Sequence, residues 1–263
     1  MSLTPMTADQ IAEFKAARRF VRFSCGAASA VAAMLTLKKY PHVVLSNAYL
    51  AEEHEDNRRF LADVERWLGV EIVVVRDEKY DASAYNVFRR ERFIKGRNGA
   101  PCRERLKGRP LDKLRQPGDI VVLGYTAEEV DRADNLRDRA PDVQFEFPLI
   151  DEGITKPAAL GIIEKAGINL PIMYRLGFNN ANCIGCPKGG MGYWNMVRKF
   201  FPERFMEMSA IEQELGPGSY LFQGPVGEPR ISLAELDPDR GRHSTILPDC
   251  DMFCASREDT NDE

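Results

Sequence analysis

The chain has 263 residues, a net charge of -4 and a pI of about 5.6, with 44% hydrophobic and 29% charged residues. These values are typical of a globular protein with a sizeable core, and they exclude a globally basic field for nucleic acid. No apolar run approaches the ~20 residues of a membrane helix, and residues 1–10 lack a signal-peptide core. We therefore expect a cytoplasmic protein without a membrane partner, in which six cysteines favour metal or redox roles over disulfides.

The first half of the chain alternates β-prone apolar runs with amphipathic segments. Strands that alternate with helices in this way predict an α/β fold, with a doubly wound, mostly parallel five-stranded sheet. A small-residue turn joins the first strand to an Ala/Leu-rich helix. The expected strands cover residues 20–23, 42–50, 70–77, 119–125 and 145–150, and the other expected helices cover residues 7–17, 55–69 and 110–116.

The composition changes near Lys156, where short helical stretches, glycines, prolines and cysteines replace the alternating pattern. A cysteine turn at residues 183–186 leads into a helix that reaches Phe205, and the Gly/Pro-rich residues 216–248 predict irregular structure. We therefore divide the chain into an α/β domain, residues 1–155, and a cysteine-rich subdomain, residues 156–263. The subdomain is expected to cover the carboxyl ends of the strands.

The turn after the first strand has the features of a phosphate-binding loop. Small residues let backbone N–H groups approach an anion, and the following helix N-terminus adds partial positive charge. Ser24 and Ser29 add hydroxyl donors. Cys25 is expected to be a small packing residue, and its thiol would have a lowered pKa only if it were exposed at this helix N-terminus. A tight turn packed by small residues is the alternative interpretation. The predicted nucleotide-binding residues here are Ser24, Cys25, Gly26, Ala27, Ala28 and Ser29.

The cysteines suggest a metal centre, because Cys183 and Cys186 form a C-x-x-C pair. In one interpretation Cys102 joins this pair to hold a [4Fe–4S] cluster, with a fourth ligand from Cys250 or Cys254. In a second, the first three cysteines bind alone and leave one iron open. In a third, Cys183, Cys186, Cys250 and Cys254 form a structural zinc site. Buried thiols without a metal are the remaining alternative.

A dense basic stretch over residues 89–109 brackets Cys102. Guanidinium and ammonium groups suit phosphate and sulfate, so the stretch predicts a cover over a nucleotide's phosphates or a contact with nucleic acid. A solvated loop is the alternative interpretation. The predicted nucleotide contacts in this stretch are Arg103, Arg105 and Lys107.

Six segments in order resemble the phosphoadenosine-phosphosulfate (PAPS) reductase family of PP-loop proteins, over roughly residues 20–190. The loop at residues 24–29 has the pattern S-x-G-x-x-S, with Ala28 where ATP pyrophosphatases carry Asp, which favours the reductase branch. Asn47 and Pro101 stand where the family usually has Asp and the first cysteine of a pair. The other matching segments are VVLSNAYLAEEHEDNRRFL, CRERLKGRPLDKL, VVLGYTAEEVDRADN, FPLID and YRLGFNNANCIGCPKGG.

This resemblance implies an adenine nucleotide alpha hydrolase-like fold and an enzyme that performs thiol- and Fe–S-dependent sulfur chemistry on an adenine nucleotide. The tail around Cys250 resembles the mobile Glu-Cys-Gly-Leu-His tail of the reductases. In that family the tail cysteine attacks the sulfur of PAPS or adenosine phosphosulfate, and a thioredoxin-like dithiol protein then releases sulfite.

Two other functions fit the same motifs. An ATP-dependent sulfur transferase would bind ATP on the loop, adenylate a carbonyl oxygen of a nucleobase or nucleic acid, and deliver sulfur from the cluster. A non-enzymatic module would bind a nucleotide without turnover and use zinc as a structural staple. A homodimer is the default expectation for the assembly, because dimers are the commonest oligomers of soluble proteins.

Overall fold

The computed structural model describes residues 16–96, 99–224 and 228–248. Residues 7–15 of the first expected helix, together with Cys250 and Cys254, lie outside the described residues.

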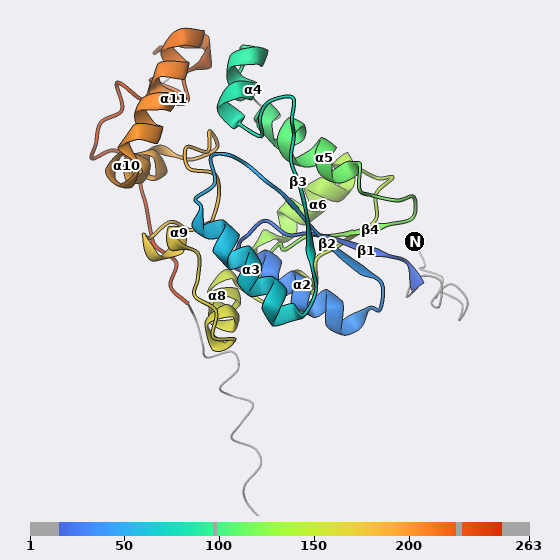
Figure 1. Cartoon of the computed structure of the whole chain (residues 1–263). Coiled ribbons are helices and arrows are strands. Elements are labelled where there is room, and N and C mark those ends of the chain that lie inside the picture. Colours follow the sequence, from blue (N-terminus) through green and yellow to red (C-terminus); the bar gives the residue numbers. More distant parts are fainter. Residues whose placement is uncertain (1–15, 97–98, 225–227, 249–263) are drawn as a thin grey trace, which may run out of the picture.

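A five-stranded parallel sheet forms the centre of the fold (Figure 1), which confirms the expected α/β class. The strand order is β3-β2-β1-β4-β5, and every paired neighbour runs parallel. β4 is apolar and buried throughout, as expected for a parallel strand covered on both faces, whereas the edge strand β3 exposes Val73 and Val74. The strands are β1 (Arg19–Arg22), β2 (Val43–Ala48), β3 (Ile72–Val75), β4 (Ile120–Val122) and β5 (Phe145–Glu146).

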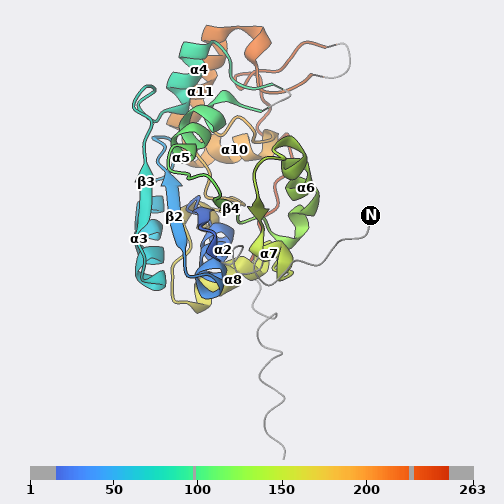
Figure 2. The same cartoon turned by 90° about the vertical axis from the view of Figure 1, so that its right-hand side faces the viewer.

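Helices flank the sheet on both faces (Figures 1 and 2). Successive residues of β1 point to opposite faces, so Val21 packs in a cluster with α2 and α8, whereas Phe20 packs in a cluster with α4, α10 and α11. The helices are α2 (Ala27–Lys39), α3 (Asp56–Leu68), α4 (Ala84–Glu91), α5 (Arg109–Asp112), α6 (Val130–Arg139), α7 (Pro148–Asp151), α8 (Lys156–Lys165), α9 (Ile172–Arg175), α10 (Met191–Phe200) and α11 (Pro202–Leu215). Shorter turns of helix are the π-helix η1 (Arg103–Gly108) and the 3-10 helices η2 (Ala127–Glu129) and η3 (Pro217–Ser219).

Prolines account for two differences from the expected elements. The expected fifth strand stops after two residues because Pro148, which has no N–H group, begins α7 instead. Pro202 likewise begins α11 and divides the single helix that was expected to reach Phe205. The helix expected at residues 110–116 begins earlier, as η1 and α5, and ends at Asp112.

The second half of the chain packs on both faces of the sheet. Helix α8 lies against α2, whereas α10 and α11 lie against each other and α11 contacts α4. Residues 216–248 are irregular as expected, apart from η3 and one β-bridge between Phe222 and Ile231. None of the helices in the described ranges is long and apolar enough to cross a membrane.

Candidate functional site

A cavity of about 1230 Å³ opens where β1 and β4 end. The chain order of the strands reverses between these two neighbours, and ligands of open α/β sheets bind in the crevice at such a switch point. The loop after β1, the chain after β4 and η1 all contribute to its wall. The predicted site residues that line the cavity are Ser24, Gly26, Ala28, Ser29, Arg103 and Lys107.

Hydrogen bonds between its own residues hold the loop after β1. Ser29 Oγ donates to the carbonyl of Gly26 at 2.8 Å and accepts from the backbone N–H of Ser24 at 3.1 Å. Ser24 is exposed to the cavity, and helix α2 begins directly after Gly26. The N-terminus of a 13-residue helix therefore faces the space in which an anion would sit.

Cys25 and Ala27 of the same loop are buried in the core and do not line the cavity. Cys25 adopts a left-handed backbone conformation with φ 55°, and its Sγ accepts a hydrogen bond from Asn47 Nδ2 at 3.4 Å. Burial raises the pKa of the Cys25 thiol to about 12, with a further contribution from Glu53. The favoured interpretation of Cys25 as a small packing residue is therefore confirmed, and the exposure that would lower its pKa is not found.

Asn47, at the position where the resembling family usually has Asp, anchors the loop. Its Nδ2 also donates to the carbonyl of Phe23 at 3.0 Å, so one amide fixes the loop at two points. Asn47 is buried at 1% exposure, and its backbone belongs to β2. An amide can donate these bonds, whereas an ionised Asp cannot.

Gly124 brings the end of β4 against the start of α2. A Cβ atom at this position would lie 2.7 Å from the backbone N and Cα of Ser29 and 2.8 Å from the carbonyl carbon of Ala28. Only glycine allows this approach, and it closes one wall of the cavity directly over the phosphate loop.

The basic stretch contributes two of its three predicted contacts. Arg103 and Lys107 line the cavity, but Arg105 pairs with Glu91 at 2.5 Å and is absent from the lining. The π-helical conformation is marked by a bond from the N–H of Arg109 to the carbonyl of Glu104, five residues earlier. Single π turns are frequent at functional sites.

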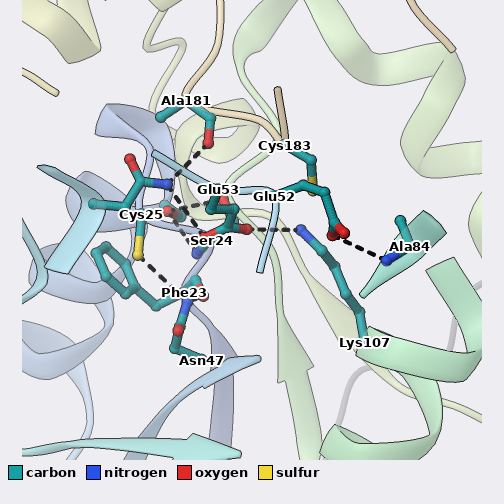
Figure 3. A network of polar contacts seen from close by, with 12 residues as sticks. Phe23, Ser24, Cys25, Asn47, Glu52, Glu53, Ala84, Lys107, Ala181 and Cys183 are labelled. Carbon is teal, nitrogen blue, oxygen red and sulfur yellow. Dashed lines mark hydrogen bonds and ion pairs between the residues drawn. The ribbon is translucent and has the colours of Figure 1, made fainter. Parts of the chain in front are cut away.

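Lys107 connects the cavity to a buried polar network (Figure 3). Its Nζ lies 3.2 Å from Oε1 of Glu53, whose side chain is only 2% exposed. Asn57 Nδ2 donates to the other oxygen of Glu53 at 3.2 Å. Burial lowers the pKa of Lys107, but the nearby Cys183 and Glu53 outweigh burial and raise it above its ordinary value. Lys107 is therefore a protonated cation between the cavity and the cysteines.

Three predicted metal ligands, the thiols of Cys102, Cys183 and Cys186, lie in described residues and are close enough to affect one another electrostatically. Burial and then Cys186 raise the pKa of Cys102 to about 12. Burial also raises the pKa of Cys183. Cys186 and Cys102 raise this pKa further, whereas the charge of Lys107 lowers it. All three are free thiols. They do not line the cavity, but the adjoining residues Pro101 and Asn182 do.

The C-x-x-C turn is fixed by one tyrosine hydroxyl. Tyr193 Oη accepts from the N–H groups of Gly185 and Cys186 at 3.0 and 3.1 Å, and it donates to the carbonyl of Cys183 at 2.9 Å. The N–H of Ile184 donates to the carbonyl of Glu52 at 2.8 Å, which ties the turn to the segment after β2. In the described part of the chain, no group of three or more His, Cys, Asp or Glu side chains is arranged to hold a metal ion.

The two remaining predicted cysteines, Cys250 and Cys254, lie outside the described residues. The segment before them passes the phosphate loop, because Ile246 lines the cavity and its N–H donates to Asn179 Oδ1 at 3.0 Å.

Several residues of the site were not predicted from the sequence. Glu53 lies in the acidic stretch after β2 that matched the resembling family, so its position in that stretch was a usable signal. Arg22 stands as a charged residue at the end of an otherwise buried strand, which was another signal. Nothing in the local sequence distinguishes Gly124 or Arg115 from an ordinary turn residue.

Over 216 residues, the chain is 27% identical to an uncharacterized protein of Methanocaldococcus jannaschii. The match covers 78% of this chain and 43% of that relative, so the chain spans less than half the relative's length. No family model and no solved structure matches the chain.

Proposed function

We propose that this protein is a PAPS reductase-like enzyme that binds an adenine nucleotide in the cavity and performs sulfur chemistry with its thiols. The main supporting observation is that Lys107 lines the same cavity as the Ser24–Ser29 loop and is close enough to Cys183 for the two groups to interact electrostatically. The strand order β3-β2-β1-β4-β5 supports an adenine nucleotide alpha hydrolase-like fold. On this proposal, residues 156–263 form the cysteine-rich subdomain.

Phosphate groups would bind between the loop and η1. The start of α2 and the exposed hydroxyl of Ser24 provide donors on one side, and Arg103 and Lys107 provide positive charge on the other. This arrangement suits the phosphosulfate of a sulfonucleotide or the phosphates of ATP. It leaves Lys107 between this anionic group and the proposed cluster ligands Cys102, Cys183 and Cys186.

We propose that Cys102, Cys183 and Cys186 hold a [4Fe–4S] cluster. The donor set fits, because clusters are bound by thiolates and Lys107 would offset part of their negative charge. In a cluster each thiolate binds a separate iron, so the ligands need not converge on one point as they do around a single ion. When bound, the cluster would supply electrons or sulfur. The zinc alternative needs Cys250 and Cys254, which lie outside the described residues.

In the proposed reaction, the thiolate of Cys250 attacks the sulfur of the bound sulfonucleotide, and the nucleotide phosphate leaves. One thiolate of a thioredoxin-like dithiol protein then attacks Sγ of Cys250 in the resulting S-sulfo-enzyme and releases sulfite. Its second thiolate resolves the mixed disulfide, which regenerates the Cys250 thiolate and leaves the dithiol protein as a disulfide. Only a thiolate serves as the nucleophile in this step. Ile246, four residues before Cys250 in the sequence, lines the cavity.

An ATP-dependent sulfur transferase is the second candidate. The observation in its favour is that three thiols, rather than four, share one neighbourhood in the described residues. A cluster with three thiolate ligands leaves one iron for an additional sulfide, which thiolation of a nucleobase or nucleic acid would need.

The proposal is tested on protein purified without oxygen. We expect iron and acid-labile sulfide, lost in the Cys102→Ser, Cys183→Ser and Cys186→Ser variants and retained in Cys25→Ser, the matched control with a buried thiol outside the group. A colourless protein with one zinc would reject the cluster. Release of sulfite from a sulfonucleotide, abolished in Cys250→Ser, would support the reductase. Formation of AMP or pyrophosphate from ATP in the presence of a nucleic-acid acceptor would support the transferase. Nucleotide binding without turnover would reject both.

A further inference from the structure

Three arginines line the side of the cavity that lies toward α5. Arg22 ends β1, Arg103 begins η1, and Arg115 follows α5 by three residues. Figure 2 shows α5 and α6 on either side of β4. Burial lowers the pKa of Arg22, and the charges of Arg115 and Arg103 lower it further. Three permanently charged side chains from β1, η1 and the segment after α5 therefore line the same cavity.

We call Arg22, Arg103 and Arg115 the arginine cluster. The carboxylate of Asp112 lies close to two of its members. Oδ1 of Asp112 lies 2.5 Å from an Nη atom of Arg22 and 3.7 Å from an Nη atom of Arg115, so both arginines meet the same oxygen. Arg103 has no carboxylate partner in the ranges that the structure describes. The cluster therefore carries more positive charge than its own carboxylate neutralises.

Two of the three arginines also contain a buried N–H donor without an acceptor. The buried Nε atoms of Arg22 and Arg115 have no hydrogen-bond partner. Buried donors are rarely left without an acceptor in folded proteins. Arg18 shows the satisfied arrangement, because its Nε and an Nη atom donate to the two oxygens of Asp119 at 2.7 and 2.6 Å. Arg22 makes one hydrogen bond to Asp112 and Arg115 stays 3.7 Å from it, so Asp112 satisfies only part of the donor capacity of these two arginines.

We propose that Arg22, Arg103 and Arg115 form a second phosphate-binding subsite in the cavity, separate from the Ser24–Ser29 loop. This inference rests on the proposed function, which assigns the loop to the first phosphate group. Phosphate oxygens accept from guanidinium forks, and a bound phosphate would supply the negative charge that Asp112 provides only in part. The cavity volume of about 1230 Å³ leaves room for this group beside a nucleotide.

The phosphate can come from two sources. It is either an additional phosphate of the bound nucleotide, as on the 3′ position of its ribose, or a phosphate of a second substrate. Calorimetric titration with three probes separates these sources: adenosine 5′-monophosphate, adenosine 3′,5′-bisphosphate, and inorganic pyrophosphate added to protein saturated with the monophosphate.

Arg115→Gln and Asp112→Asn provide opposite tests. We expect Arg115→Gln to weaken the binding of the probe that occupies the subsite, either the bisphosphate or pyrophosphate, about tenfold. The affinity for the monophosphate should stay within about twofold of the wild type. Asp112→Asn removes the competing carboxylate, so it should strengthen the same probe about threefold to tenfold. Lys113→Gln, an exposed neighbour outside the cavity lining, is the matched control and should change nothing. An effect on the bisphosphate identifies the nucleotide as the source, and an effect on pyrophosphate alone identifies a second substrate.

The subsite is rejected if both variants remain folded by circular dichroism and all affinities stay within twofold of the wild type. If the folded wild-type protein binds neither nucleotide, the proposed function fails, and pyrophosphate alone then tests the subsite. Binding that Arg115→Gln weakens and Asp112→Asn strengthens would support the subsite without the nucleotide. Absence of both effects would overturn it.

Discussion

Lys107 and Glu53 form the ion pair on which the polar network behind the cavity depends. Glu53 is only 2% exposed and lies 3.2 Å from Lys107 Nζ, whereas the second cation, Arg58, is 3.5 Å away. Removing one member of a buried pair leaves the other charge without compensation. Because Lys107 is itself 35% exposed and Arg58 remains, we expect Lys107→Gln to lower the free energy of unfolding by about 2 kcal/mol.

A double-mutant cycle measured by urea unfolding checks this interpretation. In the Glu53→Gln/Lys107→Gln variant no buried charge is left without its partner, so at least half of the lost stability should return. Lys113→Gln controls for the loss of an exposed lysine. If the two single effects simply add in the double variant, the pair is not coupled and Lys107 stabilises the network by another route.

Glu212 gives the fold a distinct pH dependence. It is fully buried, and its two oxygens accept from the N–H groups of Leu221 and Leu233, each at 2.6 Å. Burial raises its pKa to about 7. An unfolded Glu titrates near ~4.3, so between these values the folded state holds the extra proton. Stability from this group is therefore complete below about pH 4.3 and is lost as pH rises to about 7.

We expect Glu212→Gln to remove this slope. The loss of stability between pH 5 and pH 7.5 should be smaller in the variant by on the order of 2 kcal/mol, whatever the variant does to stability at a single pH. Urea unfolding at several pH values measures the difference. Glu214→Gln, on an exposed position of the same helix, should keep the wild-type slope. Parallel curves for the wild type and Glu212→Gln would contradict the assignment.

At the scale of elements, the sequence predicted what depends on local pattern. The apolar residues of each run located all five strands, although β1 begins and ends with arginine and β5 contains Glu146. Ends were less accurate, since a strand extends only as far as a neighbour pairs with it. The run at residues 145–150 pairs with β4 at two positions only before Pro148 begins a helix.

The π-helix η1 could not be predicted in the same way. Its sequence, Arg103–Gly108, has no periodicity that distinguishes a π turn from an α turn. The conformation results from tertiary contacts, in which Leu106 is fully buried while Lys107 reaches Glu53. Burial raises the pKa of the Cys102 thiol, and the charge of Lys107, five residues further along the chain, offsets part of that rise. Sequence reasoning identified both residues, but only the helix geometry explains why they act together.

At the scale of the whole molecule, the cavity joins segments that the sequence places far apart. The loop after β1 was predicted because small residues between a strand and a helix have a local signature. The arginine cluster was not, because Arg22 and Arg115 are 93 residues apart (115 − 22) and meet only through the crossover that brings β4 beside β1. Long-range convergence of this kind leaves no local pattern.

Gly124 is the point at which this convergence can be tested. In Gly124→Ala the new Cβ would meet the backbone of Ser29 at 2.7 Å, and backbone cannot give way as a side chain can. Overpacking of this kind typically costs about 1–3 kcal/mol, and it should move β4 away from the phosphate loop. Gly218→Ala, at a position with nothing within 4 Å, controls for the loss of a glycine.

The ligand response then separates damage to the site from damage to the fold. A nucleotide at one hundred times its dissociation constant stabilises the folded state by about 2.7 kcal/mol, which raises the Tm of a protein of this size by about 5–10 °C. We expect this rise in the wild type and in Gly218→Ala. In Gly124→Ala the Tm should start lower and rise little with the same nucleotide concentration, because the two walls of the cavity no longer meet. An equal rise in Gly124→Ala would show that the nucleotide binds elsewhere on the molecule.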